Sequence, residues 1–490
     1  MTMYHISDLK KYLRCPRYYY LSKNFNDKSI PYLRNDYDIT ALILKKYGIK
    51  DYFKGVSHDT NDKFFENQNF EWYVKPRFEY HNLRVKIPLM HKIADNLFDL
   101  YYVSMTLFPK EDDLANYVDT EWVLDNLNIG VNKIKIIHLN HQYLRKQDLE
   151  PGLLFVETSS FYTANGKKGR NIKEAIIEEG KDLDAILFEM EGLDLADFSP
   201  IKTHRCYRRN KCAMYGECFS EENEYPENSI MTLVASRNKN RMFKKGIRFL
   251  KDAEVKNIEG TKQQYAQIMA DRLGGLYIDR LGLKMWLEKL NAYPLIFIDF
   301  EWERFLIPPY EKMKPYDVLC FEYSIHILDS NNYLTHKVFL ETGDCRLAFI
   351  KNLINDIPDT GAIIAFNAMG AECLRIKELA EQFPAYQAKL LSLNDRIIDL
   401  SIPFNKGLVY DTRMKGLYSV KTLLSIVCDR DYKDLNISDG MEAVYQWRMI
   451  DGKINPDVCK IKQELIEYCS LDTYSMVEIY WWLLRILNNS

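Results

Sequence analysis

The feature that most constrains this chain is an apolar run that ends in closely spaced carboxylates, Pro294–Glu303 (Pro-Leu-Ile-Phe-Ile-Asp-Phe-Glu-Trp-Glu). A short run rich in Ile and Phe predicts a buried β-strand. Side chains alternate between the faces of a strand, so Asp299 and Glu301 lie side by side on one face. Two carboxylates this close repel each other by about 1 kcal/mol in water, and by more where solvent is thin, unless a cation lies between them. The stretch is therefore either the mouth of a metal site or a strand end that continues into a solvated acidic loop.

Length, charge and hydropathy limit the class of protein to which this strand can belong. A chain of 490 residues is expected to form two or three domains, and 47% hydrophobic with 28% charged residues is typical of a globular protein. The net charge of -3 argues against a uniformly basic coat for nucleic acid. No apolar run reaches transmembrane length and the N-terminus has no secretory leader, so we expect a cytoplasmic protein with no membrane partner.

Four of the ten cysteines form a pattern that suggests a metal site. Cys206, Cys212 and Cys218 are separated by two gaps of five residues that contain Arg, Lys, Asn and Gly, unlike a core segment. Disulfides are not expected in the cytoplasm, and thiolates bind soft metals. A fourth ligand is needed, and Cys15 is the candidate if the helix expected over residues 5–25 folds back against this segment. The spacing does not separate an iron–sulfur cluster from a zinc ion, and unligated cysteines remain a third interpretation.

The Cys15-Pro16-Arg17 sequence, followed at a distance by a cysteine triplet, resembles the RecB-type nucleases that carry an iron–sulfur cluster. These belong to the PD-(D/E)xK-like nucleases, and their CRISPR-associated members are the best known. In that family four cysteines bind a [4Fe–4S] cluster that joins the two ends of the nuclease domain. The resemblance implies that Cys15, Cys206, Cys212 and Cys218 hold such a cluster, with zinc as the alternative.

The same family cuts DNA with an Asp on one strand and Glu-x-Lys on the next. The strand-like stretch Ile93–Phe98 resembles the first part and offers Asp95, but Tyr102-Val103-Ser104 stands where Glu-x-Lys is expected. Losing the second carboxylate and the lysine removes a metal ligand and the charge that activates the attacking water. We therefore expect residues 1–225 to keep the PD-(D/E)xK-like fold with Asp95 as a remnant of its catalytic site, and to act as a scaffold or nucleic-acid clamp.

The remainder of the chain predicts a connector and an α/β domain. Residues 226–290 alternate basic and apolar residues, with helical spacing over 263–273 and 278–290, and are expected to form a helical connector. In residues 291–490, three strand-like runs are followed by a helix, a fourth strand near 361–367 and a further helix. This order predicts a mixed sheet with flanking helices.

Two further groups of polar residues lie in this C-terminal part. Glu372 falls in the first turn of the helix that follows the fourth strand, where a carboxylate alone is only a favourable N-terminal charge. Tyr468 and Asp472 are four residues apart on the long final helix, so they share one face. Taken alone, such a Tyr–Asp pair is commonly a structural hydrogen bond.

The order of these motifs resembles that of the DEDD exonucleases: Asp-x-Glu on the first strand, an acid after a later strand and Tyr-x-x-x-Asp on the last helix. These have an RNase H-like fold, and the tyrosine marks the DEDDy subgroup. The resemblance implies that Asp299, Glu301 and Asp472 hold two divalent ions, Mg²⁺ or Mn²⁺. Glu372 stands where the family usually has Asp, and Ala371 replaces the usual aromatic residue, so the metal spacing or the substrate class can differ.

The remaining assignments follow from the same resemblance. Glu372 would reach a metal through water, and Tyr468 would orient the attacking water. Asp399 would hold a metal ligand in place without touching the metal, or would position the substrate. The whole chain also resembles a bacterial family that fuses an iron–sulfur RecB-type domain to a DEDD-like domain, a resemblance that includes Ser419-Val420-Lys421 and Tyr468–Thr473.

These resemblances together imply a metal-dependent 3′–5′ exonuclease that hydrolyses nucleic-acid phosphodiesters by a two-metal mechanism in its C-terminal domain. The expected partner is nucleic acid, with DNA favoured over RNA. The alternative is a catalytically inactive protein of nuclease fold that binds nucleic acid or another partner.

Overall fold

A computed structural model of the chain describes residues 3–23, 30–192, 200–201, 203–207, 212–219, 225–428, 430–452 and 456–488. The chain divides into two compact units. Unit 1 comprises Met1–Ser29, Asn35–Asn223 and Leu306–Tyr316, and unit 2 comprises Ile30–Arg34, Glu224–Phe305 and Asp317–Ser490. No helix in the described ranges is long and apolar enough to cross a membrane.

Unit 1 is built on a six-stranded mixed sheet of order β2-β3-β6-β7-β8-β9. Its strands are β2 (Phe53–Lys54), β3 (Trp72–Val74), β6 (Leu89–Ala94), β7 (Leu97–Ser104), β8 (Gly130–Leu139) and β9 (Phe155–Thr158). The strands β7 and β8 are parallel and are joined through helix α5 (Leu114–Asn126), as a parallel pair requires. Two smaller sheets are formed by β1 (Tyr4–His5), β5 (Leu83–Lys86) and β4 (Arg77–Tyr80), and by β10 (Ser160–Tyr162) and β11 (Lys168–Asn171).

Nine α-helices are described in unit 1, and several of them pack on these sheets. They are α1 (Ile6–Arg14), α2 (Pro16–Ser22), α3 (Ile39–Tyr47), α4 (Asn61–Phe65), α5, α6 (Pro151–Leu154), α7 (Ile172–Glu179), α8 (Asp184–Glu191) and α9 (Tyr215–Cys218). The hydrophobic core of unit 1 includes the fully buried side chains of Leu9, Phe98 and Ile172, which come from a helix, a strand and a second helix.

The single helix expected over residues 5–25 is two helices, α1 and α2, that meet at Cys15. Pro16 is the cause, because the ring of a proline disfavours the helical conformation of the residue before it, and Cys15 is extended (φ -171°). Pro16 then occupies the first position of α2, where its missing N–H is no loss. The break holds Cys15 at a helix junction instead of within a helix.

The strand expected over Ile93–Phe98 is also interrupted, by the two-residue turn of the β6–β7 hairpin. Ala94 pairs with Leu97, which leaves Asp95 and Asn96 in the turn, and Asn96 adopts a left-handed conformation (φ 56°) that asparagine tolerates. Asp95 is fully exposed there and forms an ion pair with Lys92 at 2.9 Å. Asp95 is thus a turn residue, outside the sheet in which the expected catalytic position would lie.

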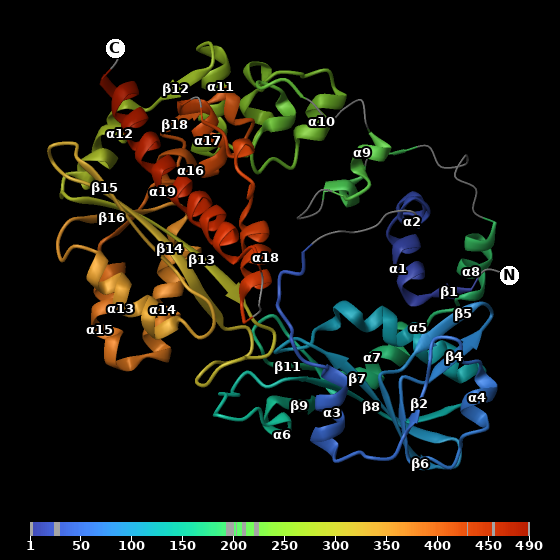
Figure 1. Cartoon of the computed structure of the whole chain (residues 1–490). Helices are drawn as coiled ribbons and strands as arrows, with labels where there is room; N and C mark the ends of the chain where they lie inside the picture. The colour runs from blue at the N-terminus through green and yellow to red at the C-terminus, as the bar shows by residue number, and fades with distance from the viewer. Residues whose placement is uncertain are drawn as a thin grey trace. The chain divides into compact units, whose positions relative to one another are not determined.

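Unit 2 contains a five-stranded mixed sheet of order β15-β14-β13-β16-β17 (Figure 1). Its strands are β13 (Leu295–Arg304), β14 (Val318–Leu328), β15 (Leu334–Leu340), β16 (Ala362–Ala365) and β17 (Ile397–Asp399). The first three are antiparallel neighbours, whereas β16 runs parallel to both β13 and β17. The expected mixed α/β sheet is therefore present in this unit.

Helices lie on both faces of this sheet. They are α13 (Arg346–Asp356), α14 (Glu372–Gln382), α15 (Gln387–Asn394), α16 (Ile402–Asn405), α17 (Val420–Val427), α18 (Gly440–Ile450) and the 31-residue α19 (Val458–Asn488). The ring of Phe297 lies 6.1 Å from Tyr480 of α19, and that of Phe300 lies 5.2 Å from Phe349 of α13. Positions 297 and 300 differ by an odd number of residues, so α19 and α13 cover opposite faces of β13. Figure 1 shows α19 running across β13 and β14.

The segment expected as a helical connector, residues 226–290, falls within unit 2. It contains α10 (Lys239–Lys244), α11 (Lys262–Arg272), α12 (Arg280–Leu287) and the strand β12 (Leu276–Ile278), which pairs with β18 (Val409–Asp411). Ala266, Leu283 and Trp286 join the core formed by the sheet and α19. The basic and apolar alternation of this segment therefore belongs to a packed part of unit 2.

Each unit also contains a short segment from a distant part of the sequence. In unit 1, residues 306–316 pair with the loop near residue 145, because Arg145 N–H donates to Met313 O at 3.0 Å and Lys312 N–H donates to Arg145 O at 2.8 Å. In unit 2, Arg34 N–H donates to Arg304 O at 2.9 Å at the end of β13. The chain thus passes between the units several times.

Candidate metal centre

The acidic residues of unit 2 meet at the carboxyl end of its parallel strands. The parallel pairing of β13 with β16 ends at Phe297 and Ile364, so β13 continues beyond its neighbour and carries Asp299 and Glu301 past that edge. The register between β13 and β14 shifts after Glu301, so a bulge lies directly at the acidic pair. Bulges of this kind re-aim side chains beside functional sites.

Three carboxylates converge there closely enough to share an ion. Asp299 and Glu301 come from β13 and Asp472 from α19, and one ligand oxygen of each lies within 4.8 Å of the other two. Among the described residues they are the one group of three or more His, Cys, Asp or Glu side chains that meets this distance. Hard oxygen ligands at this spacing suit Mg²⁺ or Mn²⁺.

Tyr468 lies beside this group, one helical turn before Asp472 on α19 and on the same face. It is 3% exposed, and a Cβ placed on Gly440 would lie 3.9 Å from its hydroxyl oxygen and 3.7 Å from a carboxylate oxygen of Glu301. The first residue of α18 therefore closes over Glu301 and Tyr468 without a side chain of its own. The structure brings together Asp299, Glu301, Tyr468 and Asp472.

Glu372 lies at the same site, on the helix that follows β16. It is the first residue of α14 and is 2% exposed, and its Oε2 atom has no hydrogen-bond partner in the described structure. The chain reaches it through a tight turn in which Asn367 is left-handed (φ 58°). The Asp399 carboxylate accepts from the backbone N–H groups of Asn367 and Ser401, each at 2.9 Å, and so holds this turn.

Five of the predicted site residues line one cavity of about 350 Å³, and Asp399 is not among its lining residues. The carboxylates of Asp299, Glu301, Glu372 and Asp472 face it, together with the rings of Trp302, Phe366 and Tyr468. An acidic cavity with aromatic walls can hold cations together with a planar, negatively charged substrate group.

Burial and mutual repulsion raise the pKa of the two β13 carboxyls. Burial is the larger cause for Asp299, followed by the charges of Asp472 and Glu372, and its pKa lies well above the ordinary 3.8. The pKa of Glu301 also lies well above its ordinary 4.5, again from burial first and then from the charge of Asp472. Without a cation, these groups therefore bind protons at pH values where exposed carboxyls are ionised.

The pKa values of the other two carboxyls, Glu372 and Asp472, are also raised. Burial raises the pKa of Glu372 to about 8, and the charge of Asp399 adds to this. Burial raises the pKa of Asp472 to about 6, against the opposing effects of the Tyr432 hydroxyl and the Lys421 ammonium. A buried group of acids that resists ionisation is the environment that divalent cations stabilise.

Three neighbours of this site were not assigned a role from the sequence. The Tyr432 hydroxyl donates to Asp472 Oδ1 at 2.6 Å and fixes that carboxylate. The Lys421 ammonium lies 5.2 Å from the Tyr432 ring and 5.1 Å from the Tyr468 ring. Glu322 of β14 pairs directly with Glu301 across the sheet. Lys421 belongs to the Ser419-Val420-Lys421 stretch that carries a family resemblance, whereas Tyr432 and Glu322 lie in stretches without a motif.

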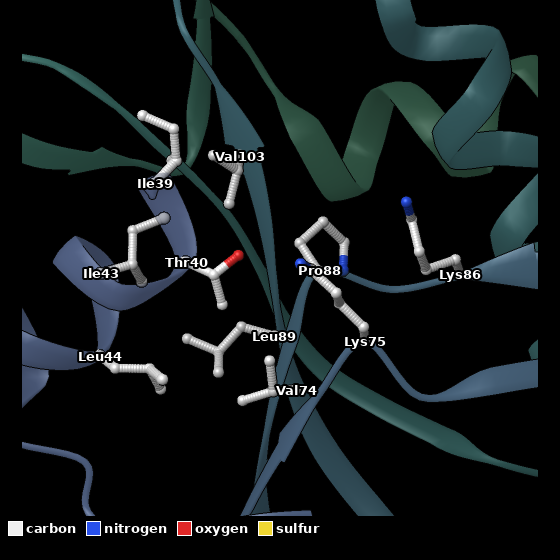
Figure 2. A pocket seen from close by; sticks show the side chains of 10 residues that line it. All are labelled: Ile39, Thr40, Ile43, Leu44, Val74, Lys75, Lys86, Pro88, Leu89 and Val103. Atoms are coloured by element: carbon white, nitrogen blue, oxygen red, sulfur yellow. The ribbon is translucent and has the colours of Figure 1, made fainter. Parts of the chain in front are cut away.

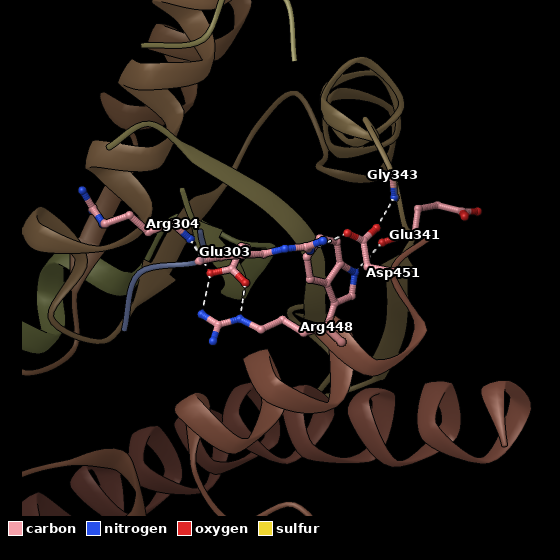
Figure 3. A network of polar contacts seen from close by, with 8 residues as sticks. Glu303, Arg304, Glu341, Gly343, Arg448 and Asp451 are labelled. Carbon is pink, nitrogen blue, oxygen red and sulfur yellow. Dashed lines mark hydrogen bonds and ion pairs between the residues drawn. The ribbon is translucent and has the colours of Figure 1, made fainter. Parts of the chain in front are cut away.

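A polar network fixes α18 at the edge of the cavity (Figure 3). Arg448 donates from Nε to one oxygen of the buried Glu303 at 2.5 Å and from Nη2 to the other at 2.9 Å. Asp451, directly after α18, accepts from the backbone N–H of Gly343 at 2.8 Å and from Arg34 Nη1 at 2.5 Å. These two anchors hold the helix whose first residue covers Glu301.

In unit 1 the four cysteines predicted as ligands line a separate cavity of about 450 Å³. Arg205 donates from Nη1 to the carbonyl oxygens of Leu13 and Arg14 at 2.9 and 2.8 Å, which ties the cysteine segment to the end of α1. Arg17 Nε donates to Cys218 Sγ at 3.3 Å. Burial raises the pKa of the Cys218 thiol. The structure thus gathers Cys15, Cys206, Cys212 and Cys218, whereas residues 208–211 between them lie outside the described ranges.

The residues predicted as a degenerate catalytic site do not gather. Asp95 is exposed in its hairpin turn, Tyr102 is buried, and Ser104 Oγ lies 2.9 Å from Thr106 Oγ1. An unpredicted acid, Asp99 of β7, is 7% exposed and accepts from Asn132 Nδ2 at 2.8 Å. That bond and one from the next backbone N–H hold a bulge in β8, so Asp99 has a structural role.

Unit 1 also has an apolar cavity of about 140 Å³, in which side chains of α3 face β3, β6 and β7 (Figure 2). Its walls are mainly aliphatic: Ile39, Ile43, Leu44, Val74, Leu89 and Val103, with Thr40, Pro88 and the stems of Lys75 and Lys86. No carboxylate or thiol lines it, so it offers no metal ligands.

Comparison with known proteins adds a family match within unit 2. Residues 296–419 match a domain of unknown function, DUF2779. The matched segment includes Asp299, Glu301, Glu372 and Asp399 and stops before Tyr468 and Asp472. No curated protein matches the sequence significantly.

Among solved structures, the chain resembles part of the family B DNA polymerase from the hyperthermophilic archaeon Pyrobaculum calidifontis. The match has 14% sequence identity and a TM-score of 0.25, and covers 39% of this chain and 24% of the polymerase chain. A similarity this weak assigns neither fold nor activity.

Proposed function

We propose that unit 2 is a metal-dependent 3′–5′ exonuclease of the DEDDy type. The observation that carries this proposal is the convergence of Asp299, Glu301 and Asp472, whose ligand oxygens lie within 4.8 Å of one another. Glu372 and Tyr468 line the same cavity, so the five residues that the resemblance implies face one space. Asp399 would act through the turn that it holds, as a positioning residue for Glu372.

The sheet supports an RNase H-like fold for this unit. Its first three strands are antiparallel, the next two continue parallel to the first, and the long C-terminal helix packs on the face that carries the acids. The acids lie at the carboxyl end of the parallel strands, where open α/β sheets place their ligands.

Two unpartnered buried groups fit the expected ions. Glu372 Oε2 and both carboxylate oxygens of Glu322 have no hydrogen-bond partner in the described structure. Burial raises the pKa of both carboxyls to about 8, so a bound cation would offset the cost of ionising them. Asp299, Glu301 and Asp472 would hold the ions. When bound, the ions would activate water and stabilise the leaving 3′ oxygen.

The protein groups then position the substrate and the water. The Tyr468 hydroxyl faces the cavity beside Asp472 and would orient the attacking water by a hydrogen bond. Tyr432 holds Asp472 in one orientation by its 2.6 Å bond. The Lys421 ammonium, between two tyrosine rings, supplies a positive charge for the phosphate of a bound strand. The expected products are nucleoside monophosphates released from a 3′ end, with DNA favoured over RNA.

For unit 1 we propose a RecB-type, PD-(D/E)xK-like domain that binds nucleic acid and does not cut it. The exposed Asp95 and the buried Tyr102 favour the loss of cutting. A [4Fe–4S] cluster would be held by the four cysteines, with zinc as the alternative. Sulfur atoms around a single zinc ion lie about 3.8 Å apart, given Zn–S bonds of about 2.3 Å. No three of these described cysteines come within 4.8 Å of one another, so a single zinc ion would require them to move closer together.

The test is hydrolysis of end-labelled single- and double-stranded DNA and RNA with Mg²⁺ or Mn²⁺. The full chain is expected to shorten 5′-labelled strands one nucleotide at a time from the 3′ end. Asp299→Asn and Asp472→Asn should abolish this, since each removes a ligand from the three-carboxylate group. Asp359→Asn is the matched control, because Asp359 is exposed in the same unit and away from the cavity.

Two results would contradict the exonuclease proposal. One is the absence of hydrolysis of every substrate with either ion. The other is activity that persists in both Asp299→Asn and Asp472→Asn. Binding of labelled DNA without hydrolysis would instead favour the alternative of an inactive nucleic-acid-binding protein.

A further inference from the structure

Glu322 is a carboxylate in unit 2 that no motif accounts for. It lies near the middle of β14, and its backbone pairs directly with that of Glu301. Residues directly opposite on antiparallel strands point to the same face, so Glu322 points toward α19, as Glu301 does. The charge of Asp472 on α19 contributes to the raised pKa of Glu322, which agrees with this orientation.

The surroundings of Glu322 do not satisfy it. The residue is completely buried (0% exposed), and neither carboxylate oxygen has a hydrogen-bond partner in the described structure. Glu322 also contributes to the raised pKa values of Asp299, Glu301 and the Cys469 thiol, so its near neighbours are acids and a thiol. A buried carboxyl without partners destabilises a fold strongly, and an apolar residue of similar size would be more stable.

This arrangement requires a group that the polypeptide does not supply. We infer that Glu322 is a fifth carboxylate of the metal centre, facing the ions from β14. Its oxygens lie outside the described group whose ligand atoms are within 4.8 Å, so Glu322 contacts an ion through a water molecule and not directly. Carboxylates placed in this way orient the water ligands of a metal and strengthen its binding.

The inference rests on the proposed metal centre but not on hydrolysis. Glu322 comes from β14, whereas Asp299 and Glu301 come from β13 and Asp472 from α19, so the ions would be surrounded by three elements of the unit. Glu372, at the start of α14, lines the same cavity and adds a fourth element.

The experiment measures Mn²⁺ binding by the full chain by isothermal titration calorimetry, and Tm with EDTA and with Mn²⁺. The variants are Glu322→Gln, which keeps the shape, and Glu322→Met, which is apolar. In both, we expect the dissociation constant for Mn²⁺ to rise by about 10- to 100-fold. In EDTA both should melt at or above the wild-type temperature, because the unpartnered carboxyl is gone.

Tyr323→Phe is the matched control. Tyr323 is the next residue on β14 and is equally buried, but it points to the opposite face, where its hydroxyl donates to Asp356 Oδ2 at 2.7 Å. This variant should lower Tm in EDTA by losing that bond and leave Mn²⁺ affinity unchanged.

The inference is overturned if Mn²⁺ affinity stays within about twofold of wild type in both Glu322 variants, a change smaller than any expected for a residue that supports a metal. It is also overturned if both variants melt well below wild type in EDTA, which would make Glu322 an ordinary structural residue. The proposed function fails separately, when the wild-type chain binds no Mn²⁺ or hydrolyses no nucleic acid. A wild-type chain that binds Mn²⁺ without hydrolysis, together with weakened binding in both variants, supports the role of Glu322 and contradicts the exonuclease.

Discussion

The buried carboxyls of unit 2 make its stability depend on pH in an unusual direction. Burial raises the pKa of Glu372 from 4.5 to about 8. Between those pH values the folded state holds a proton that the unfolded state has lost, so the free energy of unfolding falls as the pH rises. Glu372→Gln cannot lose that proton, and the metal-free variant should therefore become more stable than wild type as the pH rises from 5.5 to 8.

The size of the effect follows from the same shift. A rise in pKa from 4.5 to about 8 corresponds to about 5 kcal/mol for Glu372 titrating alone. The difference will be smaller than this because the neighbouring carboxyls of Asp299 and Asp472 compete for the same protons. At about 2 °C per kcal/mol for a unit of this size, the variant should melt several degrees above wild type at pH 8. At pH 5.5 the difference should be much smaller, at most about 1.4 kcal/mol, because only about one pH unit separates it from the unfolded pKa of 4.5.

The assay is thermal unfolding in EDTA across this pH range, repeated with saturating Mn²⁺. With Mn²⁺ at pH 8, wild type should melt at a higher temperature than Glu372→Gln, because the ion replaces the protons and stabilises the wild-type fold more. Glu381→Gln is the control, since Glu381 is exposed on the same helix, α14. A difference between Glu372→Gln and wild type that does not change with pH would refute the reasoning, as would a control that shows the same trend.

Further predictions test single contacts. Tyr468→Phe should lower kcat about 100-fold and leave Mn²⁺ affinity unchanged, because it removes the hydroxyl that orients water and no metal ligand. Lys421→Met should lower kcat/KM by a similar factor, about 100-fold, and Lys421→Arg should recover part of it, as measured on a labelled oligonucleotide. Arg448→Ala leaves the buried Glu303 without its partner and should lower the free energy of unfolding in urea by about 3–5 kcal/mol. Replacing both Glu303 and Arg448 by Met should lower it less. Cys218→Ser should lower the bound iron and the brown absorption of the purified chain; wild type with bound zinc and no iron would contradict the cluster.

The strands that carry the candidate site could be predicted because their apolar patterns are long and uninterrupted. The second of the three expected strand-like runs is β14, Val318–Leu328, and the acidic residues lie at the end of β13 as its sequence predicts. The four-residue spacing of Tyr468 and Asp472 correctly placed both on one helical face. These inferences depend on local geometry, which the sequence determines directly.

The omissions arise where a distant segment decides the contact, whereas the errors have local causes. Nothing near Glu322 in the sequence shows that it pairs with Glu301, because a cross-strand register depends on how two strands align. Tyr432 lies in a short turn and meets Asp472 forty residues later in the chain. Asp95 was misplaced for a local reason, since Asn96 can adopt a left-handed turn that divides one apparent strand into two.

The exchange of short segments between the two units affects the order in which the protein can fold during synthesis. Unit 1 is translated first, but it includes residues 306–316, which lie in the connection between β13 and β14 of unit 2. Arg145 therefore cannot form its backbone hydrogen bonds with Lys312 and Met313 until more than half of the chain has been synthesised. A fragment that stops at residue 225 would lack this segment, and one that starts at residue 291 would lack the Arg34 segment beside β13. The nascent chain must therefore keep unit 1 incomplete until the strand bearing Asp299 and Glu301 has already been made.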